Sequence, residues 1–190
     1  MVWRRRARKD TGRSGWWTWL GVALIAFVAF GVWLQRQHKV AAQGGCPPTE
    51  TVTAVLDGDT IRFDCAGVAL SGRLAGVDAP EKLQPHGPEA RAFLAALIDE
   101  GPVIVTTTDT DRYGRAIVEL VPKSGGPSLN ARLVAAGFAW HYKRFSQDAA
   151  LAAAEDAARE GQLGLWADTA PTPPWAWRKA HRGKDGDAAP

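Results

Sequence analysis

The chain has 190 residues, a formal net charge of +3 and an isoelectric point near 9.1, and roughly its first 45 residues differ in composition from the rest, which leaves one small domain. The positive charge lies mainly at the N-terminus: residues 1–15 hold six Lys and Arg, whereas residues 43–190 hold 15 Lys and Arg against 19 Asp and Glu. The domain is therefore acidic, so the overall charge excludes any argument from isoelectric point to a nucleic-acid ligand. Such a ligand has to be argued from particular residues.

An uncharged apolar run covers residues 16–34. As a helix it would span about 28 Å, close to the apolar thickness of a bilayer. Tryptophans lie at both ends of the run and basic residues precede it, as is typical of membrane proteins. The pattern predicts a transmembrane helix over 16–34, a basic cytoplasmic tail over 1–15, and a domain outside the cytoplasm, in the periplasm or the extracellular space. The alternative is a signal peptide that is cleaved near Ala42, which would release a secreted domain.

Residues 35–49 form a polar linker that contains Gly and Pro. The two cysteines, Cys46 and Cys65, face an oxidising compartment if the domain lies outside the cytoplasm. They either form a disulfide between the entry to the domain and the end of its second strand, or they remain two unpaired thiols. Their Cα separation decides between these alternatives and cannot be derived from the sequence.

The domain is predicted over residues 50–167. Alternating or β-branched residues predict strands over 51–56, 60–63, 68–77, 103–108 and 115–121. Asp57-Gly58 predicts a tight hairpin turn between the first two strands. Apolar residues at helical spacing predict three helices, which open at Gly87-Pro88, Ser128 and Asp148.

Five strands with three helices predict an α+β fold that is mainly β, a five-stranded barrel of the OB type. The strand face and loops of such a barrel can accommodate an oligonucleotide, although a fold alone does not establish a function. The composition of residues 168–190 changes to Pro, Ala, Lys and Asp, which predicts a loose C-terminal tail. Within this tail, Trp175 and Trp177 form a pair that is a candidate for docking on the domain.

Three carboxylates lie at predicted strand ends: Asp59 follows the hairpin turn, and Asp78 and Glu81 belong to the VDAPE segment. Carboxylates are hard oxygen donors suited to Ca²⁺ or Mg²⁺, and Asp59 and Asp78 at the ends of neighbouring strands can share one ion. Asp57 precedes a glycine, as turn residues do, so we expect it to shape the turn or at most to contact the metal-binding residues without binding the metal itself.

Arg73 lies within the third predicted strand, where a guanidinium is costly unless it meets an anion. That anion is either one of the aspartates or a phosphate. Tyr113 and Arg115 belong to the DRYGR turn, which can also be a simple connection. Two arginines, a tyrosine hydroxyl and an oxygen-bound cation together make a clamp for a phosphodiester, and Glu81 is then free to position or deprotonate a water.

The motifs DGDT, RLAGVDAPE, GPEA and DRYGR follow one another in this order. With them, residues 51–166 resemble the staphylococcal nuclease (thermonuclease) family. DGDT alone would be a weak signal, but the four motifs together are highly specific. The resemblance implies an OB-fold phosphodiesterase that uses Ca²⁺ to hydrolyse DNA and RNA, and Mg²⁺ is the less favoured ion.

The resemblance also implies roles for single residues. Asp59 and Asp78 match the metal carboxylates, and Ala79 stands where the family often has Thr, whose backbone carbonyl binds the ion. Glu81 matches the residue that orients or activates the attacking water. The two arginines that match the phosphate-binding pair of the family are Arg73 and Arg115.

Three aromatic residues match substrate contacts in the family. Tyr113 matches the tyrosine near the 5′-phosphate of the substrate, and Tyr142 matches a tyrosine of the nucleotide pocket. Trp140 occupies a second aromatic position that is Tyr in the type member; it can stack on a base but has no hydroxyl. The loop between Glu81 and Gly87 is also shorter than in the type member, which puts the binding of the substrate by this loop in question.

Two functions of other classes are compatible with parts of the sequence: a module of the same fold that binds nucleic acid or protein without catalysis, and a structural membrane protein whose carboxylates bind Ca²⁺ for stability. The first is disfavoured because all the catalytic positions are filled, by Asp59, Arg73, Asp78, Glu81 and Arg115. The second would leave both arginines without an anion. The sequence indicates no obligate protein partner, and it does not separate DNA from RNA or an endonuclease from an exonuclease.

Overall fold

The computed structural model describes residues 27, 28, 30, 31, 46–49 and 51–182. The chain divides into two compact units, Met1–Gln43 and Gly44–Pro190, and the second contains the predicted domain. Within the described residues, no helix combines the length and the apolar character needed to cross a membrane. Most of the predicted span over 16–34 lies outside the described residues, as do the predicted cytoplasmic tail and most of the linker.

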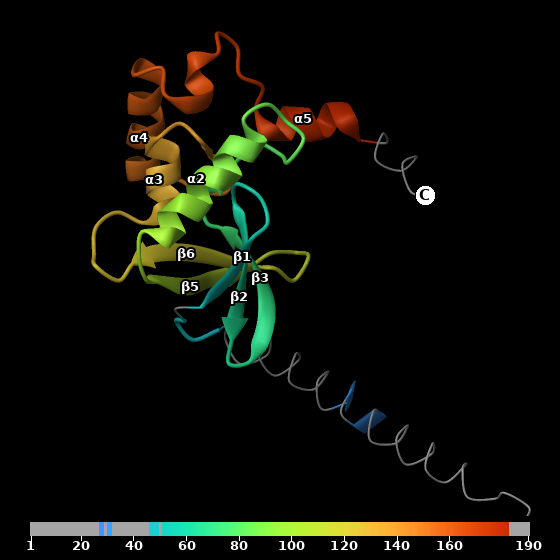
Figure 1. Ribbon diagram of the computed structural model, residues 1–190. Coiled ribbons are helices and arrows are strands. Elements are labelled where there is room, and N and C mark those ends of the chain that lie inside the picture. Colours follow the sequence, from blue (N-terminus) through green and yellow to red (C-terminus); the bar gives the residue numbers. More distant parts are fainter. Residues whose placement is uncertain (1–26, 29, 32–45, 50, 183–190) are drawn as a thin grey trace, which may run out of the picture. The chain divides into compact units, whose positions relative to one another are not determined.

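A five-stranded sheet forms the centre of the domain (Figure 1). Its strands are β1 (Val52–Val55), β2 (Thr60–Cys65), β3 (Val68–Leu74), β5 (Val103–Thr110) and β6 (Ala116–Pro122), in the order β1-β2-β3-β6-β5. Neighbours are antiparallel except β3 and β6, which are parallel. Two backbone hydrogen bonds between Thr49 and Val105 link the chain before β1 to β5 and so close the sheet towards a barrel. The predicted α+β class and OB-like arrangement of five strands are confirmed.

The third predicted strand, over 68–77, is broken in two. β3 ends at Leu74, the chain turns at Ala75 and Gly76, and β4 (Val77–Asp78) pairs with β7 (Trp140–His141) in a separate two-stranded sheet. Gly76 has a φ of +73°, a left-handed conformation that glycine adopts without a Cβ clash. The break turns Asp78 away from the line of β3.

The prediction of a tight turn at Asp57-Gly58 is wrong in its geometry, because the chain there does not form a two-residue hairpin turn. Residues 56–59 connect β1 to β2, and Gly58 lacks the positive φ that a two-residue hairpin turn requires. Oδ1 of Asp57 instead accepts a hydrogen bond from the backbone N–H of Asp59 at 3.1 Å, so Asp57 is a turn residue as expected. Gly58 is needed for space, because a Cβ there would lie 2.7 Å from the Cβ of Ala79.

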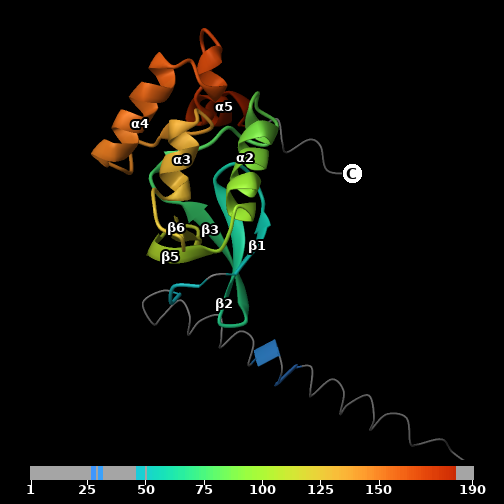
Figure 2. The ribbon, with the colours of Figure 1, turned by 60° about the vertical axis from the view of Figure 1, so that its left-hand side comes forward.

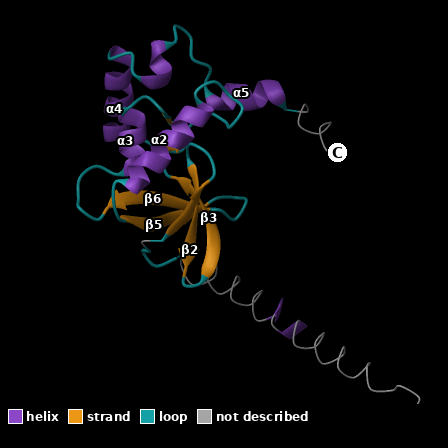
Figure 3. Cartoon of the chain, in the orientation of Figure 1, coloured by secondary structure: helices purple, strands orange, loops and turns teal. Residues whose placement is uncertain are grey.

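Within the domain, the helices gather on one side of the strands (Figure 3). The three predicted helices are present as α2 (Gly87–Asp99), α3 (Leu129–Ala135) and α4 (Ala149–Glu160). Ser128 and Asp148 cap α3 and α4 through their side chains, as the sequence predicts. After a short 3₁₀ helix η1 (Gly164–Ala167), the chain forms a further helix, α5 (Pro174–His181), where the sequence predicts a loose tail. Proline in the first turn is compatible with a helix, so the Pro-rich composition conceals this one.

The core lies between the sheet and the helices. Its largest fully buried apolar side chains are Ile61, Phe63, Leu74, Leu94, Leu120, Leu129, Leu133 and Leu165. Cys46 and Cys65 form a disulfide with their Cα atoms 5.8 Å apart, which decides between the two alternatives for the cysteines. A cross-link that closes a loop of this length stabilises a domain by about 3 kcal/mol, chiefly by restricting the unfolded chain.

Candidate active site

Asp59, Arg73 and Asp78 form the centre of the candidate active site. Asp59 directly precedes β2, Arg73 lies near the end of β3, and Asp78 ends β4. The Arg73 guanidinium joins the two carboxylates: Nη1 is 2.8 Å from Oδ1 of Asp59, and Nη2 donates to Oδ1 of Asp78. The Asp78 side chain is fully buried and that of Asp59 is 5 % exposed. One predicted phosphate-binding arginine thus brings together the two predicted metal ligands.

The strand register explains why these residues meet. Thr60 lies opposite Arg73 in the β2–β3 pair, and the carbonyl of Asp59 accepts the N–H of Leu74 at 2.8 Å. Asp59 is therefore held beside the end of β3. In one continuous strand, Asp78 would lie about 17 Å beyond Arg73, since each residue advances about 3.3 Å. The turn between β3 and β4 brings it back within hydrogen-bonding distance.

The Asp59 carboxyl accepts three hydrogen bonds. Besides Arg73, Thr60 Oγ1 donates to Oδ1 at 3.0 Å, and the backbone N–H of Ala79 donates to Oδ2 at 2.9 Å. Burial raises the pKa of Asp59 to about 7, and the neighbouring Asp78 adds to this, although the Arg73 charge and the Ala79 N–H oppose it. A buried carboxylate that is this costly to ionise gains from a further positive charge nearby.

Burial also acts on Arg73. Burial alone would lower the pKa of Arg73, but the charges of Asp59 and Asp78 outweigh it and raise that pKa above its ordinary value. The guanidinium is therefore charged at every relevant pH.

Glu81 lies at the solvent edge of this centre and is 39 % exposed. Its backbone N–H donates to Oε1 of the buried Gln84 at 3.1 Å, and its carbonyl accepts the N–H of Gln84 at 2.8 Å. The same carbonyl lies so close to Gly87 that a Cβ there would be 2.0 Å away. The short loop from Glu81 to α2 is therefore a tight turn, which places the Glu81 side chain beside Asp78.

A second arginine, Arg178 of α5, completes the cluster. Its Nη1 donates to Oε1 of Glu81 at 2.6 Å and to Oδ1 of Asp78 at 3.1 Å, and its Nη2 donates to Oδ2 of Asp78 at 2.8 Å. Burial alone would lower the pKa of Arg178, but hydrogen bonds to Asp78 and Glu81 outweigh it and raise the pKa. The cluster thus holds three carboxylates and two guanidinium groups.

Arg178 is not among the site residues predicted from the sequence, because it falls in the segment predicted to be a loose tail. Arg178 lies 100 residues after Asp78, and no motif links the two positions. The only signal was the neighbouring Trp175 and Trp177 pair, which was recognised as a candidate for docking. The structure confirms docking for Trp175, whose ring lies nearly parallel to that of Tyr142 with the ring centroids 6.0 Å apart. The ring of Trp177 instead stacks on His181 of the same helix, with centroids 4.0 Å apart.

The other predicted phosphate clamp residues lie in the β5–β6 turn. Nε of Arg115 forms an ion pair with Oδ2 of Asp111 at 2.8 Å, and Tyr113 is 71 % exposed. Among the described residues, no hydrogen bond or ion pair joins Arg115 or Tyr113 to the Asp59–Arg73–Asp78 centre. The sheet nevertheless brings the turn near, because Ile117, two residues after Arg115, lies opposite Arg73.

The predicted nucleotide-pocket residues lie on and just after β7. Trp140 is opposite Asp78 in the β4–β7 pair, but it is 3 % exposed and packs edge-on against Trp166 and Trp175. Tyr142 is half-buried between Phe145 and Trp175. Trp140 is therefore buried beside the site and does not expose its ring to solvent, and Tyr142 is covered on one side by α5.

The chemistry of the donors fits a hard divalent cation. Asp59, Asp78 and Glu81 supply carboxylate oxygens, and the guanidinium of Arg178 is a stand-in cation between the last two. In the described part of the chain, no three His, Cys, Asp or Glu side chains are already grouped as a metal centre. Binding a cation by all three carboxylates therefore requires a rearrangement around Arg178.

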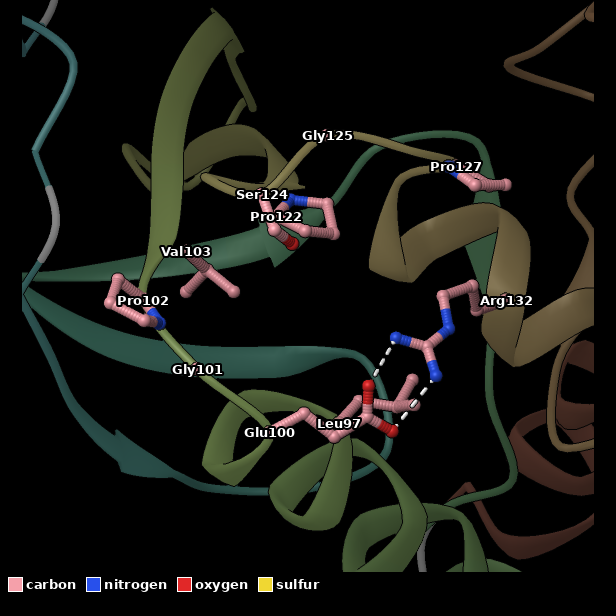
Figure 4. Close-up of a pocket in the computed structure, with 10 residues that line it drawn as sticks. All are labelled: Leu97, Glu100, Gly101, Pro102, Val103, Pro122, Ser124, Gly125, Pro127 and Arg132. Carbon is pink, nitrogen blue, oxygen red and sulfur yellow. Dashed lines mark hydrogen bonds and ion pairs between the residues drawn. The ribbon is translucent and has the colours of Figure 1, made fainter.

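A separate cavity of about 290 Å³ lies between the end of α2, the start of β5 and the loop after β6 (Figure 4). Across it, Arg132 forms a bidentate ion pair with Glu100 at 2.7 and 2.8 Å. None of the predicted site residues lines this cavity. It is therefore distinct from the carboxylate cluster.

Comparison with known proteins assigns the domain to a family. The staphylococcal nuclease homologue family matches residues 72–168, just over half of the chain. The chain therefore belongs to the staphylococcal nuclease homologue family. The match includes Arg73, Asp78, Glu81 and Arg115, and it ends before α5.

Several nucleases are similar to the chain over the same domain. An uncharacterized endonuclease of Escherichia coli is 40 % identical over 127 residues, which cover 67 % of this chain and 82 % of that protein. A micrococcal nuclease of Shigella flexneri is 39 % identical over 140 residues, covering 69 % and 80 %. The staphylococcal-like nuclease CAN1 of Arabidopsis thaliana is 37 % identical over 111 residues, covering 58 % of this chain and 34 % of that protein.

Proposed function

We propose that the domain is a Ca²⁺-dependent phosphodiesterase that hydrolyses DNA, RNA or both. Membership of the family supports nuclease activity, and relatives that are named endonuclease or micrococcal nuclease support it further. The single observation that carries the proposal is the cluster in which Arg73 joins Asp59 and Asp78 beside Glu81. Acidic oxygens and guanidinium groups in one place suit a cation and a phosphate together.

The metal ligands in this proposal are the carboxylates of Asp59 and Asp78, with the backbone carbonyl of Ala79. When bound there, Ca²⁺ would act as a Lewis acid that polarises a phosphate oxygen. Asp59 and Asp78 are already held together by Arg73 and by the Ala79 N–H, so little backbone ordering remains to be done. Mg²⁺ uses the same donors and is the less favoured ion.

Glu81 is the proposed group for the water. Its carboxylate is at the solvent edge of the cluster, where it can accept a proton from a water or orient it for attack on phosphorus. As a general base it would contribute roughly 10²- to 10⁴-fold to the rate. To do so, Glu81 has to exchange its ion pair with Arg178 for the water.

Arg73 and Arg115 are the proposed phosphate ligands, and Tyr113 is the proposed contact to a neighbouring phosphate. Charge-assisted hydrogen bonds from guanidinium groups stabilise the negative charge that develops on the phosphate oxygens. The partly exposed Arg115 side chain can turn from Asp111 towards a substrate, because the register places its strand beside Arg73. Tyr142 and Trp140 are the proposed base contacts.

The test uses the full chain in mild detergent with plasmid DNA, single-stranded DNA and RNA. We expect hydrolysis with Ca²⁺, little with Mg²⁺, and none after addition of a chelator. Glu81→Gln should lower the rate at least about a hundredfold. The matched control is Glu89→Gln, an exposed carboxylate in the first turn of α2, which should keep the wild-type rate. Binding of nucleic acid without hydrolysis would replace the proposal by a binding-only module.

We also propose that residues 16–34 anchor the chain in a membrane with the domain outside the cytoplasm. The support is the uncharged run flanked by Trp and preceded by basic residues. A reporter fused after Pro190 should be found outside the cytoplasm and in the membrane fraction. A soluble extracellular product that begins near Ala42 would instead establish cleavage and secretion, and a cytoplasmic reporter would overturn both.

A further inference from the structure

The C-terminal segment packs on the loop that carries Glu81. Nε2 of Gln84 donates to the carbonyl of Thr172 at 2.6 Å, and Nε2 of His86 lies 2.9 Å from Oδ2 of Asp168. Gln84 is buried, and its Oε1 holds the backbone N–H of Glu81. The segment that leads into α5 is therefore fixed to the candidate active site before the helix begins, and α5 lies next to this loop in two views (Figures 1 and 2).

One face of α5 covers two parts of the site at once. Trp175 and Arg178 are three residues apart, so their side chains leave the helix on the same side. Trp175 lies over Tyr142, the predicted base contact, with an interplanar angle of 5°. Arg178 binds Asp78 and Glu81, the predicted metal ligand and the predicted water ligand.

Arg178 leaves Asp78 without a free carboxylate oxygen facing the solvent. Its two guanidinium nitrogens take both oxygens of Asp78, while Arg73 shares Oδ1, and the Asp78 side chain is fully buried. A bidentate guanidinium is among the strongest partners of a carboxylate. A divalent cation that binds Asp78 therefore has to displace Arg178, and so does a water that Glu81 is to hold.

We propose that α5 is a cap that competes with the substrates of its own active site. Arg178 takes the place of the cation at Asp78 and of the water at Glu81, and Trp175 takes the place of a base on Tyr142. The inference rests on the proposed function, since it assumes that a divalent cation binds Asp78. When the open form is a minor state, the apparent affinity for the cation is lowered by the fraction of open molecules.

The competing hypothesis is that Arg178 is a third phosphate-binding arginine. The two roles have different consequences. A cap weakens the binding of the cation, whereas a phosphate ligand leaves the binding of the cation unchanged and raises the rate of hydrolysis. Loss of the Arg178 charge by itself also favours a cation, so a second variant is needed that opens the cap without changing the charge. Trp175→Ala is such a variant, because it removes the contact to Tyr142 and keeps Arg178.

The experiment measures Ca²⁺ binding to the full chain in mild detergent by titration calorimetry, without nucleic acid. Arg178→Ala should lower the Kd for Ca²⁺ by about tenfold or more, and Trp175→Ala by roughly threefold. Arg132→Ala removes a bidentate Arg–Glu pair of the same kind away from the site and should leave the Kd unchanged. Hydrogen exchange of the amides of α5 should become faster when Ca²⁺ is added to the wild type.

The outcomes separate this inference from the proposed function. An unchanged or higher Kd in both Arg178→Ala and Trp175→Ala, with Ca²⁺ still bound by the wild type, overturns the cap alone. Absence of Ca²⁺ binding in all variants overturns the cap and the metal dependence together. A lower Kd in Arg178→Ala only, with unchanged exchange of α5, also overturns the cap, because charge alone then explains the effect. If Arg178→Ala fails to fold, two measurements still test the cap: the Kd of Trp175→Ala for Ca²⁺ and the hydrogen exchange of α5 in the wild type.

Discussion

The Asp59–Arg73–Asp78 centre and the β5–β6 turn are predicted to form one phosphate clamp, yet they are built in opposite ways. In the centre, the two carboxylates are buried, lie directly before β2 and at the end of β4, and share the guanidinium of Arg73 on β3. In the turn, Oδ1 of Asp111 accepts the backbone N–H groups of Tyr113 and Arg115, and Oδ2 accepts Nε of Arg115. The turn is thus satisfied by its own residues.

The difference in burial gives the two aspartates opposite pKa shifts. Burial raises the pKa of Asp59 to about 7. At Asp111 burial acts in the same direction, but the hydrogen bonds from Arg115 and Tyr113 outweigh it and lower the pKa. The centre is therefore a preformed and energetically costly site, whereas the turn is a stable local structure from which Arg115 can be withdrawn at little cost.

Replacement of Arg73 is expected to have the largest effect, on stability and rate together. Arg73→Ala leaves the carboxylate of Asp59 buried without its counter-charge, and breaking a buried ion pair costs about 3–5 kcal/mol. Loss of a phosphate ligand should also lower the rate of hydrolysis by on the order of 10²- to 10³-fold. Chemical denaturation and the nuclease assay measure the two losses on the same preparation.

Arg62→Ala is the control for this variant, because Arg62 is an exposed arginine on β2. It should change stability by less than about 0.5 kcal/mol and leave the rate unchanged. If Arg73→Ala is as stable as the wild type, the buried ion pairs of the centre contribute no more to stability than the partly exposed ion pair of the turn. The contrast between the two regions would then disappear.

Arg115→Ala should lower the rate with little loss of stability. Its ion pair with Asp111 is partly exposed and contributes at most about 1 kcal/mol. If Arg115 turns towards the substrate phosphate, the rate falls by on the order of 10²- to 10³-fold, as for Arg73. The nuclease assay is compared with that of Arg112→Ala, the exposed neighbour in the same turn. Equal rates in both variants would reduce the turn to a connection between strands.

The contrast also shows which parts of the site could be predicted from the sequence. Asp59 and Asp78 can be predicted as oxygen donors at strand ends and from the family motifs, and Arg73 as a guanidinium in a strand that needs an anion; the structure brings all three together. The break of the third strand at Gly76 was missed, since a glycine within an apolar run does not reveal whether the strand bends or ends. Asp111 was missed as the partner of Arg115 for the reverse reason: a short polar turn offers several equally good partners.

The role of α5 could not be predicted for a physical reason of another kind. An isolated helix of eight residues has little stability of its own, so α5 depends on contacts such as that of Trp175 with Tyr142. Such contacts form between residues far apart in the chain and leave no periodic pattern. The fold of the barrel and its three main helices, in contrast, follow from local patterns that the core reinforces.

Gly87→Ala should disturb the centre through the backbone of Glu81. A Cβ at this position would lie 2.0 Å from the Glu81 carbonyl oxygen, so the loop has to move. Overpacking of this kind costs about 1–3 kcal/mol, and a displacement of Glu81 by about 1 Å can lower the rate up to roughly a hundredfold. Gly101→Ala is the matched control at the other end of α2, where a Cβ meets no atom within 4 Å.

The same substitution in the turn separates the two regions further. Gly114 has a φ of +81° and open space around its Cβ position, so Gly114→Ala costs about 1–2 kcal/mol through backbone strain alone. We expect stability to fall in both Gly87→Ala and Gly114→Ala, with the larger loss of rate in Gly87→Ala. A larger loss of rate in Gly114→Ala would mean that the turn, and not the loop of Glu81, sets the geometry of the site.

Asp111→Asn should have the smallest effect, and that effect should depend on pH. The pKa of Asp111 is lowered in the folded protein, so its charge stabilises the fold above the ordinary value of 3.8 and this contribution is lost as the pH falls through the folded pKa. Asn keeps an oxygen for the backbone N–H groups but lacks the charge. Chemical denaturation should therefore show the variant slightly less stable than the wild type at pH 7, with the difference shrinking towards pH 3. A difference that is the same at all pH values would mean that hydrogen bonding, and not charge, holds the turn together.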